Sequence, residues 1–320
     1  MTLDLPDAPE LPDLPAFDKH AMRRAVRRGV IRTAFVGALW LLLASFVLSI
    51  GGKVALSGLG REDHLQHVVV VGWQVAHPEF FLRGSGQGSG IVHTTASYDA
   101  TPLVVQPAAA AAKLSFRESL FGGVSRSYPD PTTAASQILQ TVGNELYADV
   151  KWKTAERKML EQLPKPVRVA AIVEFAQPLS YADYKAFVDR TGATTDIGSA
   201  PLLLGTTGDF AQEFGGPNTF TGVCAWAPFY GVQLNHGLRY HDDPIGGFRA
   251  WVASLHDSDS GALAKVGVKL SLLRDSARAG VVHGVIVQGT SAAVLLKLLN
   301  DPAVRAVHPY DVAFAVEGSR

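Results

Sequence analysis

Residues 26–53 read VRRGVIRTAFVGALWLLLASFVLSIGGK, and this stretch decides how the rest of the chain is organised. Between Arg32 and Lys53 lie 20 residues, Thr33 to Gly52, and none of them is charged. At a rise of about 1.5 Å per residue they form a helix roughly 30 Å long, the thickness of the hydrocarbon core of a bilayer. Every turn of this helix is apolar, so it has no polar face to turn toward water. The sequence therefore predicts a transmembrane helix.

A cleaved signal peptide is the competing interpretation of this stretch. Signal peptides have a short basic start and about 7–15 apolar residues, whereas here 32 residues precede a longer apolar run. The small residues Ala55 and Ser57 leave cleavage open as an alternative. We expect an anchor that is retained in the membrane.

The charges that flank the apolar run predict its orientation. Residues 19–32 carry six bases and no acid, whereas Lys53 and Arg61 beyond the run stand beside two acids. Because retained bases mark the cytoplasmic side, we expect a single-pass protein of the cell membrane, with its N-terminus inside and residues 53–320 outside. Bases at helical spacing are also expected to lie near anionic lipid of the bilayer. These bases are Arg23, Arg24, Arg27 and Arg28.

Residues 1–18 form an acidic, proline-rich arm, with five acids, no base and four prolines. Proline at this density blocks a regular helix and favours an extended, solvated chain. Spaced apolar residues allow such an arm to fold onto a partner, although a passive tail is the alternative. The candidate partner-binding residues are Leu5, Leu11, Leu14 and Phe17.

Composition limits what the remainder can be. Apolar residues make up 47% of the 320 residues and charged ones 18%, so the chain can bury a core. Its 29 bases balance 29 acids, which argues against direct binding of nucleic acid. The single cysteine, Cys224, excludes a disulfide within the chain and a thiolate metal cluster. We expect Cys224 to be a buried small apolar residue, with an intermolecular disulfide or a reactive thiol as the alternative.

The sequence predicts an α+β fold in which one transmembrane helix precedes an extracytoplasmic mixed α/β sandwich-like domain. The expected segments are a cytoplasmic arm with a basic segment (1–32), the transmembrane helix (33–52), and an outer portion (53–320). The outer portion is expected to form one domain or two subdomains, 53–164 and 165–320. Strands are predicted from β-branched runs in residues 64–78, 90–99 and 101–107.

Between the first two strand candidates, residues 83–90 read RGSGQGSG. Alternating glycines can indicate a phosphate-binding loop, but this spacing lacks the lysine of such loops and no helix is expected to follow. We predict a flexible loop here.

Residues 131–320 alternate between helix and strand patterns. One or two helices are expected to end at Pro164 and Pro166. A strand at 167–175 precedes a helix capped by Ser180. Further strands are expected at 197–205 and 220–229, helices at 246–257 and 260–277, and a strand at 281–288. Thr290 is expected to cap the next helix, and a last strand starts near Val304. This order favours an α/β layered domain.

One cluster of metal-ligating residue types stands in NHGLRYHDDP. The residues are His236, His241, Asp242 and Asp243. The segment contains turn-forming glycine and proline and no periodicity that would align the two histidines, so we expect a solvated turn. The motifs G-x-S-x-G and H-E-x-x-H are absent from the sequence. We therefore predict no catalytic residue, no metal and no cofactor; an outer enzyme built around the two histidines is the least favoured hypothesis.

Two blocks of the sequence resemble a known family. Residues 167–188 (VRVAAIVEFAQPLSYADYKAFV) and 280–314 (GVVHGVIVQGTSAAVLLKLLNDPAVRAVHPYDVAF) are similar to the opening and closing blocks of the sigma factor regulator C-terminal domain, found in YhdL-type membrane anti-sigma factors of Gram-positive bacteria. The basic helix, the span and HPEFF, within residues 23–81, resemble that family's N-terminal module with less specificity.

The resemblance implies a regulator that senses envelope conditions outside and controls an extracytoplasmic-function sigma factor inside. The chain departs from zinc-type anti-sigma domains, because their His-x-x-x-Cys-x-x-Cys motif is absent and the inner arm is short. Control is therefore expected to be direct through the arm or to pass through a partner membrane protein. The alternative is an extracytoplasmic ligand-binding module of the cell envelope without a sigma-factor role.

Overall fold

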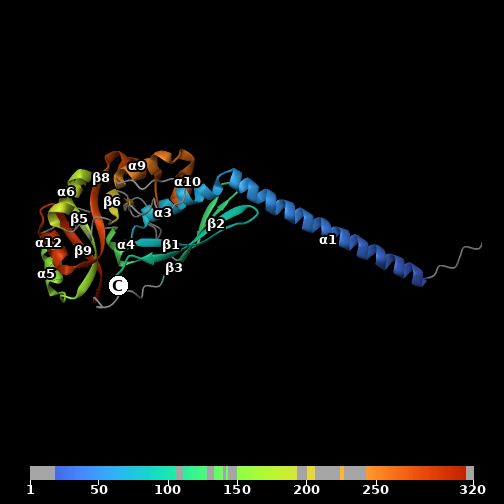
Figure 1. Ribbon diagram of the computed structural model, residues 1–320, viewed down its shortest axis with the longest axis horizontal. Helices are drawn as coiled ribbons and strands as arrows, with labels where there is room; N and C mark the ends of the chain where they lie inside the picture. Colours follow the sequence, from blue (N-terminus) through green and yellow to red (C-terminus); the bar gives the residue numbers. More distant parts are fainter. Residues whose placement is uncertain are drawn as a thin grey trace, which may run out of the picture. The chain divides into compact units, whose positions relative to one another are not determined.

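The structure, a computed structural model (Figure 1), describes residues 19–105, 111–127, 133–139, 142, 150–192, 200–205, 224–226 and 243–314. The chain divides into two compact units, Met1–Gly52 and Lys53–Arg320. The first contains most of the long helix α1 (Lys19–Gly58), and the second, called the folded unit below, begins with the last six residues of that helix.

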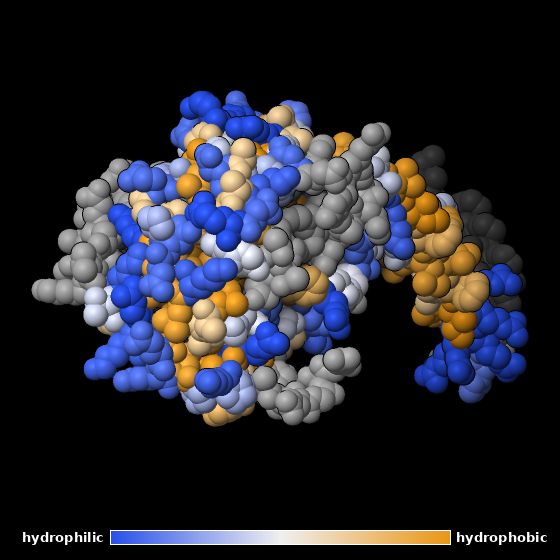
Figure 2. All heavy atoms as spheres, turned by 60° about the vertical axis from the view of Figure 1, so that its left-hand side comes forward, coloured by the Kyte–Doolittle hydropathy of each residue, from blue (hydrophilic) through white to orange (hydrophobic). Residues whose placement is uncertain are grey.

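Helix α1 is long and apolar enough to cross a membrane over Met22–Gly58, and none of its most apolar 18-residue window is buried. Large apolar side chains are exposed along α1: Phe35, Leu41 and Leu42 are 69–74% exposed. Figure 2 shows α1 as a hydrophobic surface with a hydrophilic end. A helix long and apolar enough to span a membrane is confirmed, but α1 extends beyond the predicted 33–52 at both ends. Its retention and orientation stay predictions.

A second helical segment follows directly and contradicts the strand predicted within residues 64–78. It consists of α2 (Arg61–His64), the π-helix η1 (Leu65–Val70) and α3 (Val71–Ala76). Every residue from Val68 to Ala76 is buried. The prediction was wrong because a continuous apolar run fits a buried helix as well as a buried strand, and burial on all sides overrides the strand preference of valine.

Sheet A is a four-stranded antiparallel meander in the order β1-β2-β3-β4. Its strands are β1 (Phe80–Ser89), β2 (His93–Pro102), β3 (Ala112–Ser119) and β4 (Val124–Ser127). The flexible loop predicted at residues 83–90 was therefore wrong over Arg83–Ser89, which belongs to β1. Backbone pairing with β2 holds these glycines in the ladder, with a bulge between Gly84 and Gly86.

The third predicted strand, 101–107, is only partly a strand. Thr101 and Pro102 end β2, and Leu103–Val105 continue without strand structure. The backbone N–H of Leu103 donates to the Glu79 carbonyl, and the Leu103 carbonyl accepts from the Tyr310 hydroxyl. This segment therefore joins the two sheets instead of extending one of them.

Sheet B has five strands in the order β7-β6-β8-β5-β9. They are β5 (Val167–Ser180), β6 (Leu202–Gly205), β7 (Cys224–Trp226), β8 (Val281–Ser291) and β9 (Val304–Phe314). Every pairing is antiparallel. Two interlocked split β-α-β units result, β5-α6-β6 around β8 and β8-α12-β9 around β5, which is the ferredoxin-like order with β7 added at one edge. Mixed α/β architecture, as predicted, is confirmed.

The crossover helices begin at side-chain caps. Ser180 caps α6 (Tyr181–Thr191), because its hydroxyl accepts from the Asp183 N–H, as the sequence predicted. Helix α12 (Ala292–Asn300) is capped by Ser291, whose hydroxyl accepts from the Val294 N–H. The prediction that Thr290 caps this helix was wrong: Thr290 is fully buried within β8, which runs three residues further than expected.

The remaining helices lie mostly where the sequence predicted helix. They are α4 (Ala134–Leu139), α5 (Val150–Gln162), α9 (Pro244–Ser254), α10 (Ser260–Lys265) and α11 (Leu270–Ala279), with the short 3-10 helix η4 (Asp257–Asp259). Helix α5 covers the edge of β9, because Glu156 accepts from the Val307 N–H and Lys153 donates to the Val304 carbonyl. These two bonds satisfy backbone groups that an open strand edge would leave unpaired.

One apolar core joins both sheets and the buried helical segment. Trp73 of α3 packs against Phe80 and Phe116 of sheet A, with ring centroids 5.7 and 6.3 Å apart, and Val173 of sheet B belongs to the same cluster. On the opposite face of sheet B, Ile172 joins a smaller cluster with Leu139 of α4. The expected boundary near residue 164 falls between the strands of the two sheets, which share a single main core.

Candidate functional site

The residues that the sequence singled out lie at the start of the chain. Leu5, Leu11, Leu14 and Phe17 lie outside the described residues. Arg23, Arg24, Arg27 and Arg28 are all exposed on the first three turns of α1.

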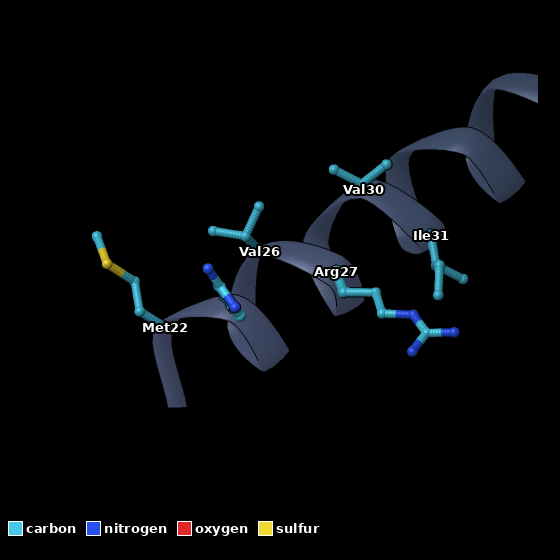
Figure 3. Close-up of a pocket in the computed structure, with 6 residues that line it drawn as sticks. Met22, Val26, Arg27, Val30 and Ile31 are labelled. Carbon is cyan, nitrogen blue, oxygen red and sulfur yellow. The ribbon is translucent and has the colours of Figure 1, made fainter. Parts of the chain in front are cut away.

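Beside these arginines, α1 carries an apolar row. Met22, Val26 and Val30 are spaced four residues apart and lie on one side of the helix, while Arg27 and Ile31 project from the other (Figure 3). The three row residues are 56–63% exposed. A helix with a basic face and an adjoining apolar row suits the boundary between lipid headgroups and acyl chains.

The predicted turn around the two histidines is only partly described. His236, His241 and Asp242 lie outside the described residues. Asp243 is the N-cap of α9, and its carboxylate accepts from the Ile245 N–H at 2.9 Å. Cys224 lies in β7, but its side chain is not described. Within the described ranges, no group of three or more histidine, cysteine, aspartate or glutamate side chains is placed to hold a metal ion.

The structure assembles a different cluster, which we call the His64 cluster, where the chain leaves α1. His64 Nδ1 lies 2.9 Å from Glu118 Oε2, and His64 Nε2 lies 3.2 Å from Asp259 Oδ1. Arg61 Nη1 donates to Glu118 Oε1 at 3.0 Å. The Glu118 side chain is fully buried and that of Asp259 is 7% exposed, whereas a quarter of His64 reaches solvent. One imidazole thus connects two buried carboxylates from distant parts of the chain.

Local structure positions each member of the His64 cluster. Gly60 breaks the helix with a left-handed backbone (φ 61°), so α2 starts afresh with Arg61 and His64 one turn apart. Glu118 takes the inward register of β3 after Leu114 and Phe116, where a strand would ordinarily place an apolar residue. Asp259 is held by the backbone N–H of His256, which donates to its carboxylate.

The cluster favours a protonated His64. Only imidazolium can donate to both carboxylates at once, whereas the neutral ring donates to one. The hydrogen bond with Glu118 raises the pKa of His64 above its usual value and outweighs the opposing effect of burial; Asp259 raises it further. The neighbouring His67 differs, because burial lowers its pKa, and its Nε2 pairs with the Ser254 hydroxyl at 2.6 Å.

A second half-buried histidine, His308, joins α5 to sheet B. His308 Nδ1 lies 2.9 Å from Glu156 Oε1, and its Nε2 lies 3.4 Å from Glu174 Oε2. Arg305 Nη1 is 2.9 Å from the other Glu174 oxygen. Burial lowers the pKa of His308, but the hydrogen bonds and charges of the two glutamates outweigh it and raise that pKa to about 9.

The two clusters differ in what they can do. Because the pKa of His308 is raised, its stabilisation is complete below about pH 6.5 and is lost as pH rises through about 9. The partners of His308 lie in sheet B and in α5, which covers the edge of that sheet. His308 therefore stabilises the packing of α5 on sheet B. His64 instead joins the first helix after α1 to both β3 and η4, so its protonation acts at the start of the folded unit.

Sequence reasoning missed the His64 cluster, because its members are 54 and 195 residues apart. One signal was present. In the alternating stretch Leu114-Ser115-Phe116-Arg117-Glu118, an acid occupies a position that the pattern assigns to the core. A buried acid of this kind requires a basic partner. Arg61 and His64 are identified as that partner only when residues 61–76 are predicted to be helical, because the helix places both side chains toward β3.

Comparison with protein-family models, with curated proteins and with solved structures finds no match to this chain. The resemblance to the sigma factor regulator family therefore stays a prediction.

Proposed function

We propose that this protein is a single-pass membrane regulator that senses envelope conditions with its outer folded unit and controls an extracytoplasmic-function sigma factor with its inner segment. The control is direct, through the arm of residues 1–18, or passes through a partner membrane protein. The observation that carries the proposal is α1, an unburied apolar helix with six bases at one end and a folded unit at the other.

The character of the inner segment supports a regulator that acts by binding. The apolar run itself, from Thr33 to Gly52, leaves no charge in the lipid. Positive charge retained at the N-terminal side favours a cytoplasmic arm. The spaced leucines and acids of the arm suit it to bind a partner.

The His64 cluster gives the folded unit a means to respond. It connects α2, which follows α1 after two residues, to sheet A and to η4. A change in the folded unit that moves Glu118 or Asp259 therefore reaches the end of α1 through one side chain.

The proposal is tested by changing the arm and recording transcription. Leu5, Leu11, Leu14 and Phe17 are replaced together by alanine in the full chain. We expect altered transcription of one sigma-factor regulon and loss of a sigma factor, or of a membrane partner, from the crosslinked complexes that co-purify with the chain.

A matched variant separates apolar contact from charge. Replacing Asp4, Asp7, Glu10 and Asp13 by asparagine or glutamine leaves the leucines in place and is expected to weaken the partner less. If neither variant changes transcription and no sigma factor or membrane partner is captured, the sigma-factor role is wrong. An extracytoplasmic ligand-binding module would then be the better account of the folded unit.

A further inference from the structure

Two hairpin turns of sheet A carry a group of apolar residues, which we call the apolar tips: the exposed Ile91, Val92 and Phe121 and the half-buried Leu120. Phe121 is 89% exposed, Val92 52% and Ile91 40%. The strands beside them are polar or small at their outer positions, as in Gln87-Gly88-Ser89 and Ser125-Arg126-Ser127. The apolar side chains at the tips are therefore not an extension of the apolar core along the strands.

The two tips form one surface. The backbone N–H of Leu120 donates to the Val92 carbonyl at 2.7 Å, so the β1–β2 and β3–β4 turns are held together. His93 pairs with Ser119 at the last step of the β2–β3 ladder. Gly122 follows Phe121 with a left-handed backbone (φ 83°), which tightens the turn and leaves the phenyl ring outside it. Contiguous exposed apolar groups of this kind mark contact surfaces.

The tips lie where α1 joins the folded unit. A Cβ on Gly122 would stand 3.2 Å from Arg61 Nη1, and the same guanidinium binds Glu118 of β3. Arg61 follows α1 after only Leu59 and Gly60, and Leu59 is itself 59% exposed. Leu56, one turn earlier, is already 2% exposed within the folded unit. The tips and the end of α1 are therefore neighbours.

Chain length limits how far the tips can stand from the apolar run. The uncharged run ends at Gly52, and α1 continues as helix for six residues to Gly58. Six residues of helix rise about 9 Å, whereas one headgroup layer is about 5–8 Å thick. If the run spans the membrane, the first residues of the folded unit stand at the headgroup boundary.

We infer that the apolar tips dock the folded unit onto the lipid bilayer, with Phe121, Val92 and Ile91 entering the interface between headgroups and acyl chains. This inference rests on the membrane anchoring within the proposed function. The binding partner is lipid and not a second protein, because the tips adjoin α1, the helix that is long and apolar enough to cross a membrane. Acids as well as bases flank this point, Glu62 and Asp63 beside Lys53 and Arg61, so the docking is apolar and does not require anionic lipid.

Spin labels measure the depth of the tips directly. In a Cys224→Ser background of the full chain, single cysteines are introduced by Phe121→Cys, Ile91→Cys and Lys185→Cys. Lys185 is exposed on α6 and serves as the water-facing control. The labelled chains are reconstituted into phosphatidylcholine vesicles, and the accessibility of each nitroxide to oxygen and to a water-soluble nickel chelate is recorded. We expect a ratio of oxygen to nickel accessibility several-fold higher at 91 and 121 than at 185.

A label at Leu42→Cys separates this inference from the anchoring on which it rests. Lipid exposure at position 42 together with water exposure at 121 would overturn the docking and leave the anchor standing. Water exposure at both positions would overturn the anchor and the docking together. Shielding of position 121 from both reagents would also overturn the docking, because protein would then cover the tips.

A charge variant tests whether the tips act as one surface. Val92→Asp with Phe121→Asp is expected to return a label at Ile91→Cys to the accessibility of the Lys185 control. Both replaced side chains are exposed, so the thermal unfolding temperature should stay unchanged. An unaltered lipid signature at position 91 in this variant would show that the tips do not dock the unit.

Discussion

Two apolar helices follow each other in this chain and meet opposite surroundings. The apolar run of α1 keeps its large side chains 48–74% exposed from Phe35 to Ile50. Val68 to Ala76, which begins only 16 residues after that run, is no more than 3% exposed at its apolar residues. Both are rich in aliphatic residues and each contains a tryptophan, so composition alone does not decide what surrounds a helix.

Length and neighbours decide instead. The first run has 20 uncharged residues and no other described element packs over its most apolar window, so lipid is the medium that matches it. The second run is short, and sheet A, α9 and α10 close around it; a Cβ on Gly72 would stand 2.8 Å from the Leu263 side chain. One helix is apolar to suit a solvent, and the other is apolar to form a core.

The two tryptophans give the largest expected contrast. Trp73→Ala should lower the free energy of unfolding by about 3–5 kcal/mol, because it empties the centre of the core, where Trp73 is fully buried. Trp40→Ala in α1, where the ring is 65% exposed, should change it by less than about 0.5 kcal/mol. Urea titration of the full chain in detergent micelles, followed by circular dichroism, checks both. Equal losses would mean that α1 also packs into a core.

A charge introduced into the apolar run of α1 should weaken membrane insertion without changing the stability of the folded unit. Leu42→Arg is expected to cost about 2.5–3.5 kcal/mol of membrane insertion and to leave the stability of the folded unit unchanged. Val54→Arg is the matched control, because Val54 is similarly exposed on α1 but lies beyond Gly52. The fraction of each variant that resists alkaline extraction from membranes is the measurement. If both variants extract alike, the apolar run is not the anchor.

His64, at the start of the second helical segment, should show a smaller effect that depends on pH. His64→Ala leaves two buried carboxylates short of a donor and is expected to lower the free energy of unfolding by about 1.5–3 kcal/mol at pH 6. Because folding raises the pKa of His64, its contribution is complete below about pH 6.5 and is lost as pH rises through the folded-state value. The difference between wild type and variant should therefore shrink from pH 6 to pH 9.

His256→Ala is the control for this pH series. The His256 side chain is 83% exposed and its Nδ1 lies 3.8 Å from Asp259, so the loss should stay below about 0.5 kcal/mol. A pH series of denaturant titrations on the two variants measures the contrast. An equal, pH-independent loss in both would contradict a proton-dependent His64 cluster.

The smallest effect is expected at the basic end of α1. Arg27→Gln should weaken the preference of that end for the anionic leaflet by about 1 kcal/mol. Arg278→Gln, which removes a similarly exposed arginine from α11, should leave it unchanged. The share of chains whose N-terminus is protected from protease after insertion into anionic vesicles reports the difference. A shift with Arg278 as large as that with Arg27 would show a general effect of net charge.

Sequence reasoning predicted the parts of this fold that local pattern specifies. The uncharged run, the Ser180 cap and the final strand-helix-strand each depend on residues close together, so their signals survive without tertiary context. Local pattern could not predict the helix at 61–76, because burial on all sides determines it. Nor could it predict the glycine-rich strand β1, which depends on pairing with β2. The His64 cluster depends on both, since the helix must form before His64 can face Glu118.

Labelling of single cysteines in intact cells tests the central claim most directly. In the Cys224→Ser background, Lys185→Cys should react with a membrane-impermeant maleimide in intact cells, whereas Asp4→Cys should react only after the membrane is permeabilised. We expect this asymmetry in a full-length product that still carries residue 4. Equal reactivity of the two positions in intact cells, or a mature chain that begins beyond residue 57, would contradict it.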